Sequence, residues 1–73
     1  MIMKTIEVKS STITRIGYEE NKLAIEYTSG ATYVYDNVPA EVFAKLVMAD
    51  SKGKFVAAEI KNKYTFTKFA KTI

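Results

Sequence analysis

The residues of this chain that could do chemistry are lysines and aromatic side chains, and most of them lie in its second half. Residues 1–50 hold five basic and seven acidic side chains, whereas residues 51–73 hold six lysines and one glutamate. Lysine ammonium groups contact phosphates, and exposed aromatic rings stack on unpaired bases. The pattern is compatible with a nucleic-acid surface; the alternative is that the lysines are solvated side chains of the kind that keep any small domain soluble. The candidate contact residues of such a surface are Tyr33, Tyr35, Lys52, Lys54, Lys61, Lys63, Tyr64, Phe66, Lys68 and Lys71.

Most other chemistry is disfavoured by the residue types present. The chain has no histidine and no cysteine, which removes the commonest general base and the usual transition-metal ligands. Among the carboxylates only Glu19 and Glu20 are adjacent, and the three glycines are isolated rather than grouped in a phosphate loop. Ser10 and Ser11 suit a turn better than a nucleophile pair. We therefore expect no enzyme activity, no metal and no cofactor.

Length and composition predict one folded domain spanning residues 1–73. With 73 residues, 48% apolar and 26% charged, the chain can form a single small core. Without cysteine, that core has no disulfide to stabilise it, which suits the reducing cytoplasm. No uncharged run approaches the length of a membrane span. We expect a cytoplasmic protein without a membrane partner.

The first half of the chain has the pattern of an antiparallel sheet. It is rich in Thr, Ile, Tyr and Val and alternates locally between apolar and polar positions, as half-buried strands do. Turn residues between the apolar runs predict short connections and a meander. The predicted strands cover residues 12–18, 22–28 and 31–36, and residues 5–8 can add a fourth.

Two short helices are predicted after Pro39. This proline suits the first position of a helix, and apolar side chains follow on one helical face at Val42, Phe43, Leu46 and Val47. Ser51 is a candidate N-cap for a second helix over residues 52–63. In residues 64–69, aromatic and polar side chains alternate, which is typical of a C-terminal strand or of an extended tail that folds back on the core. The predicted fold class is α+β, with a three- or four-stranded antiparallel meander followed by two short helices.

The register of the hairpin formed by residues 22–36 decides whether Tyr33 and Tyr35 pack in the core or are exposed for binding. A three-residue loop from Thr28 to a left-handed Gly30 pairs Ile25 with Tyr33, and it places Tyr33 and Tyr35 on the apolar face. A two-residue loop would place them on the other face as an exposed aromatic platform. The three-residue loop collects more apolar side chains on one side, so we favour tyrosines that belong to the core.

Several short motifs follow one another in a specific order. They are Ser10-Ser11, Ile16-Gly17-Tyr18, Leu23-x-Ile25-x-Tyr27, Gly30, Tyr33-x-Tyr35, Val38-Pro39 and Ser51-x-Gly53-Lys54-Phe55. Over about residues 8–66 this pattern resembles the KTSC domain, a family named for a short domain at the C-terminus of some lysyl-tRNA synthetases and also found as stand-alone proteins. One departure is Phe55-Val56-Ala57, where similar proteins tend to have an aromatic pair followed by asparagine.

The resemblance implies an RNA partner, because the domain is attached to an enzyme that handles tRNA. It also makes Tyr33 and Tyr35 the motif residues. Both implications agree with the basic character of residues 51–73. We therefore expect a small non-catalytic module that binds RNA or tRNA. The alternative is a protein-interaction module that uses an uncovered edge strand, with a protein partner or as a small homodimer.

Overall fold

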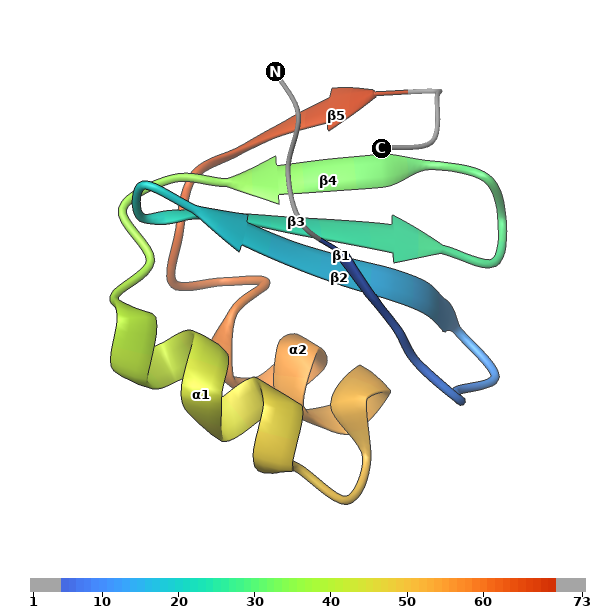
Figure 1. Cartoon of the computed structure of the whole chain (residues 1–73). Helices are drawn as coiled ribbons and strands as arrows, with labels where there is room; N and C mark the ends of the chain where they lie inside the picture. The colour runs from blue at the N-terminus through green and yellow to red at the C-terminus, as the bar shows by residue number, and fades with distance from the viewer. Residues whose placement is uncertain (1–4, 70–73) are drawn as a thin grey trace.

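A computed structural model of the chain describes residues 5–69, which form a five-stranded antiparallel sheet with two helices against one face (Figure 1). The elements are β1 (Thr5–Glu7), β2 (Ile13–Glu19), β3 (Lys22–Tyr27), β4 (Thr32–Tyr35), α1 (Ala40–Met48), α2 (Lys52–Glu59) and β5 (Phe66–Phe69). The strands lie in the order β1-β2-β3-β4-β5. The α+β class and the meander are confirmed, but the sheet has five strands rather than three or four.

Two tight turns set the register of the central strands. Glu20 and Asn21 have φ angles of 49° and 64°, as a two-residue hairpin loop between β2 and β3 requires. The β3–β4 loop has three residues and ends at Gly30, whose φ is 97°. The amide of Tyr27 donates to the carbonyl of Ala31 across this loop at 2.9 Å. The favoured three-residue loop is therefore confirmed.

The pairing of β3 with β4 places both motif tyrosines on the helix-covered face. Tyr33 lies opposite Ile25, and Tyr35 lies opposite Leu23. Side chains of directly opposed residues lie on the same face of a sheet. The tyrosines therefore share the face of the buried Leu23 and Ile25 and do not form a platform on the other side.

Helix α1 packs on the sheet through the predicted apolar stripe. Pro39 is its N-cap rather than its first residue, and the helix begins at Ala40. Leu46 is fully buried. The ring of Phe43 stacks on Tyr18 of β2 with centroids 4.9 Å apart. These contacts hold the helix against the first half of the sheet.

Helix α2 begins as predicted and ends early. The hydroxyl of its N-cap, Ser51, accepts a hydrogen bond from the amide of Lys54 at 3.4 Å. The helix ends at Glu59, not near residue 63. Ile60 has a φ of −121°, and the chain leaves the helical path there while the Ile60 side chain stays buried.

Residues 66–69 form a strand, which decides between the two alternatives for this segment. β5 pairs antiparallel with β4, with Phe66 opposite Tyr35 and Lys68 opposite Tyr33. The amide of Asp36 donates to the carbonyl of Thr65 at 2.9 Å and begins the ladder. This pairing satisfies backbone groups of β4 that would otherwise form an open edge.

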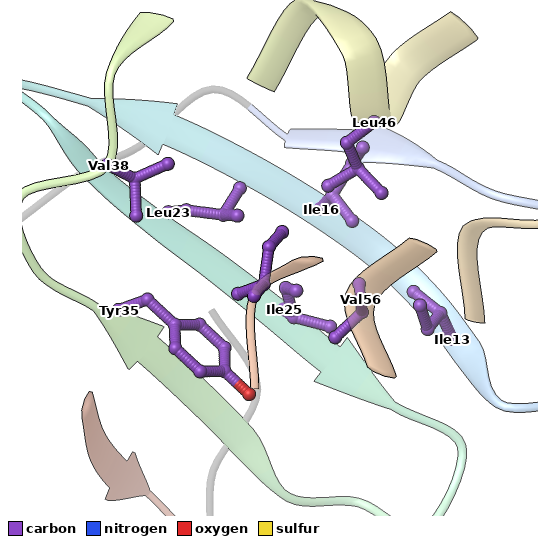
Figure 2. Close-up of a cluster of buried hydrophobic side chains, with 9 residues drawn as sticks. Ile13, Ile16, Leu23, Ile25, Tyr35, Val38, Leu46 and Val56 are labelled. Atoms are coloured by element: carbon purple, nitrogen blue, oxygen red, sulfur yellow. The ribbon is translucent and has the colours of Figure 1, made fainter. Parts of the chain in front are cut away.

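The core lies between the sheet and the two helices (Figure 2). Strands β2 to β4, the segment before α1, both helices and the turn after α2 all contribute to it. Its buried members are Ile13, Ile16, Leu23, Ile25, Tyr35, Val38, Leu46, Val56 and Ile60. Within residues 5–69, no helix is long and apolar enough to cross a membrane.

Candidate nucleic-acid interface

A hollow beside α2 brings aromatic rings, hydroxyl groups and a lysine together. Its volume is about 270 Å³. Residues from four separate parts of the chain form it: the loop before β2, the end of β3 with the β3–β4 loop, strand β4 and the turn after α2. We define the tyrosine–lysine hollow by its lining residues, which are Thr12, Tyr27, Thr28, Ser29, Tyr33 and Lys61.

Hydrogen bonds hold the polar rim of the hollow in place. The amide of Thr28 donates to the carbonyl of Thr12 at 2.9 Å. The hydroxyl of Thr28 donates to the carbonyl of Ser11 at 3.2 Å. These two bonds tie the β3–β4 loop to the segment that enters β2. The rim therefore keeps its shape without a ligand.

Tyr33 forms an aromatic wall that neighbouring rings support. Its ring meets Tyr27 edge-on, with centroids 5.2 Å apart and planes at 85°. The Phe66 ring lies 5.0 Å from Tyr33 and Tyr35 lies 6.3 Å from it. Edge-to-face and offset arrangements are the favoured geometries of aromatic pairs. Tyr33 itself is only half-buried and lines the hollow, so part of its side chain remains accessible.

Two lysines place positive charge at this wall. Lys61 is exposed and lines the hollow. The Nζ atom of Lys68 lies 5.8 Å from the centre of the Tyr33 ring, which is a cation–π distance. Tyr33 therefore shares the hollow with Lys61 and has Lys68 near its ring, and all three are among the residues named from the sequence. Lys71 lies outside the described residues.

The other candidate lysines have different surroundings. The Nζ atom of Lys52 donates a hydrogen bond to the carbonyl of Ala49 at 2.8 Å and so caps the C-terminal end of α1. Lys63 forms an ion pair with Glu59 at 3.1 Å. Lys54 is exposed near the start of α2 but does not line the hollow. These three lysines add to the positive charge of the helix layer without forming the site.

The tyrosine candidates separate into core and surface. Tyr35 is fully buried, with 0% of its surface exposed, and Figure 2 shows its ring among the core side chains. Tyr64 is half-buried and packs against the core. Phe66 is 48% exposed and extends the wall of Tyr33 along the sheet edge. Of the two motif tyrosines, only Tyr33 can contact a partner.

The hydroxyls of Tyr27 and Tyr35 lie 3.3 Å apart in a partly buried position. Burial raises the pKa of Tyr27, and the hydrogen bond to Tyr35 raises it further. Burial also raises the pKa of Tyr35. Both phenols therefore stay neutral near pH 7. The hollow offers neutral rings and hydrogen-bonding groups, not a phenolate nucleophile.

Sequence reasoning missed four residues of the hollow. Tyr27 could have been found, because the favoured register already placed it beside Tyr33 on one face. Thr28 and Ser29 were assigned only to a turn. Thr12 had no sequence signal, since its position depends on the hydrogen bond that ties its segment to the β3–β4 loop.

A second hollow of about 500 Å³ has less favourable charge for an anion. It is lined by Glu7, Val8, Lys9, Thr14 and Arg15. The guanidinium of Arg15 lies 3.6 Å from the carboxylate of Glu26 and 3.9 Å from that of Glu7. Two carboxylates therefore offset its charge. In the described part of the chain, no three metal-binding side chains come together.

Comparison with known proteins supports the fold and the motif pattern together. The sequence model of the KTSC domain matches residues 9–64. The chain belongs to the KTSC domain family. The crystal structure of a KTSC domain protein from Yersinia pestis has a TM-score of 0.88 and 36% sequence identity, and the match covers 93% of this chain and 99% of that chain.

Two bacterial relatives of this KTSC domain also match at the sequence level. A protein from Tsukamurella paurometabola is 46% identical over 59 residues, which cover 78% of this chain and 88% of the relative. An uncharacterized protein from Stutzerimonas stutzeri is 43% identical over 54 residues, which cover 71% of this chain and 76% of the relative. The resemblance found from the motifs is confirmed by the family model and by the crystal structure.

Proposed function

We propose that this KTSC domain is a non-catalytic module that binds single-stranded RNA, including the unpaired segments of tRNA, through the tyrosine–lysine hollow. The observation that carries the proposal is that Tyr33 lines the hollow together with Lys61 and has Lys68 at a cation–π distance from its ring. Aromatic rings and lysines combined in this way bind unpaired bases and their phosphates without strong sequence preference.

The chemistry of each wall suits one part of a nucleotide. The accessible part of the Tyr33 side chain is a surface on which a base can stack. Lys61 lines the hollow and Lys68 lies near the Tyr33 ring, so their ammonium groups can contact phosphates of the bound strand. The hydroxyls of Thr12 and Ser29 line the same hollow and can hydrogen-bond ribose or base edges.

Two features of the sequence support a non-catalytic, cytoplasmic module. Without histidine and cysteine the chain lacks the commonest acid–base and nucleophilic groups, and the buried phenols near the hollow stay neutral. A cysteine-free chain also suits the reducing cytoplasm, where RNA partners are abundant. The attachment of KTSC domains to some lysyl-tRNA synthetases agrees with an RNA partner.

An NMR titration of the labelled protein with a short single-stranded RNA, and separately with tRNA, tests the proposal. We expect the largest shifts at the amides of Thr12, Thr28, Tyr33 and Lys61. Two phosphate contacts at a slope of about −0.7 each predict that affinity falls about sevenfold between about 50 mM and about 200 mM salt. An unchanged spectrum at high RNA concentration would overturn the proposal.

Matched variants separate the hollow from general charge. Lys61→Gln should reduce the salt slope by about 0.7, whereas Lys45→Gln, which removes the same charge from an exposed position on α1, should leave it unchanged. Tyr33→Leu should weaken binding by about 1–3 kcal/mol, and Tyr33→Phe should retain most of the affinity because the ring remains. Equal effects of the two lysine variants would contradict a specific site.

A further inference from the structure

In the sheet formed by residues 5–69, strand β5 is an edge strand with unusual apolar exposure. All four of its residues are exposed, and Phe66 and Phe69 each expose 48% of their surface. They account for two of the four large exposed hydrophobic side chains among residues 5–69. Natural edge strands are usually protected by charges, bulges or prolines, and here Lys68 is the one charged side chain on the strand.

The hydrogen-bond pattern shows which backbone groups of β5 face away from β4. Thr65 accepts from Asp36, so this opposed pair is hydrogen-bonded. Antiparallel ladders alternate hydrogen-bonded and non-hydrogen-bonded pairs. Thr67 and Phe69 therefore bond inward to β4, while the N–H and C=O groups of Phe66 and Lys68 point outward from the sheet.

We propose that β5 pairs antiparallel with β5 of a second copy of the chain, so that two sheets join into one. This inference does not rest on the proposed RNA binding. A two-fold axis perpendicular to the sheet at Thr67 satisfies the outward groups of both copies. Phe66 of each copy then lies opposite Lys68 of the other in a hydrogen-bonded pair, and the two Thr67 residues face each other.

Side-chain complementarity favours this register over the one that is shifted by two residues toward the C-terminus. Opposed residues lie on the same face, so each Lys68 ammonium lies beside a Phe66 ring of the other copy, which is a favourable cation–π combination. The two threonines also form a favourable cross-strand pair. That shifted register, with the two-fold axis at Lys68, would place Lys68 opposite Lys68, and like charges directly opposed are destabilising.

The pairing has a predictable strength and salt dependence. A four-residue strand buries much less surface than a stable dimer interface of about 1,200–2,000 Å². We therefore expect a weak dimer that forms at high protein concentration. Because each copy carries a net charge of +3, added salt should strengthen the dimer by screening the repulsion. RNA binding should have the opposite salt dependence.

Disulfide trapping tests the register, because the chain contains no cysteine of its own. The opposed Thr67 residues form a non-hydrogen-bonded pair with a Cα separation of about 4.5 Å, which a disulfide can bridge. Phe69→Cys is the matched control on the same strand and face. Its two copies would lie about 13 Å apart, beyond the reach of a disulfide.

Under mild oxidation, Thr67→Cys should form covalent dimers at least about tenfold faster than Phe69→Cys. Sedimentation equilibrium of the unmodified chain up to about 1 mM, at low and high salt, is the independent measurement. A monomer across that range would overturn the inference. Equal trapping rates of the two cysteine variants would also overturn it, because they would indicate random collision. A dimer that strengthens with salt and traps selectively at Thr67 would establish it.

Discussion

Substitution of Gly53 by alanine should destabilise the domain, although Gly→Ala in an exposed helix normally stabilises. Gly53 is the second residue of α2, where alanine would gain about 0.5–1 kcal/mol in helix propensity. An added Cβ would lie 2.7 Å from the Oγ1 atom of Thr12. Relief of such an overlap typically costs about 1–3 kcal/mol. We therefore expect a net loss of about 1 kcal/mol.

A double-mutant cycle isolates this close approach. In a Thr12→Ala background the opposing oxygen is absent, so Gly53→Ala should stabilise by about 0.5–1 kcal/mol. The sign of the alanine effect should thus reverse, with a coupling energy of about 1.5–2 kcal/mol between the two sites. Urea denaturation followed by circular dichroism measures all four proteins, and an unchanged m-value confirms that only stability differs.

Additive effects in this cycle would refute the reasoning. If Gly53→Ala changed the free energy of unfolding equally in both backgrounds, the Thr12 side chain would rotate away at no cost, and the contact would not require glycine. Thermal unfolding of the same four proteins gives a second readout, since 1 kcal/mol corresponds to about 4–8 °C in a domain of this size.

Three further predictions address the turn, the core and the buried phenols. Gly30→Ala should cost about 1–2 kcal/mol, because its φ of 97° disfavours a Cβ although the surrounding space is open; thermal unfolding measures this. Ile25→Ala should cost about 2–5 kcal/mol in urea denaturation, since Ile25 is fully buried in the central strand. The raised pKa of Tyr27 implies that the unfolded chain ionises first above about pH 10, so stability should fall as pH rises beyond that value. Tyr27→Phe should show a shallower fall in the same titration, and an identical slope would contradict the assignment.

The fold could be predicted well where local chemistry decides the structure. Ser51 caps α2 as its side chain suggested, because a hydroxyl that accepts an amide hydrogen bond needs only the next few residues. Gly30 indicated the three-residue loop in a similar way. The loop needs one residue with a left-handed backbone, and glycine adopts that conformation without help from the rest of the fold. The sequence pattern predicted that α2 ends near residue 63, but the helix ends at Glu59. The path of the chain from Ile60 toward β5 depends on core residues that are distant in the sequence, so local patterns do not reveal it.

The candidate site was only partly predictable. Tyr33 and Tyr35 are equivalent in the sequence, yet Tyr35 is fully buried and Tyr33 is half-buried at the hollow. Lys61 and Lys63 are also close neighbours, but Lys61 lines the hollow while Lys63 pairs with Glu59. Residue type and spacing indicate what each side chain can do. The partners it meets depend on segments far away in the chain.

The sequence by itself determined the strand alternation, the turn geometry, the positive C-terminal third and the family pattern, because these depend on neighbouring residues or on composition. Only the tertiary structure decided that Thr12 joins Tyr33 and Lys61 in one hollow, and that β5 covers β4 and becomes the new edge. Those outcomes follow from the burial of one shared core and the satisfaction of backbone hydrogen bonds across the whole sheet, which are properties of the folded chain as a unit.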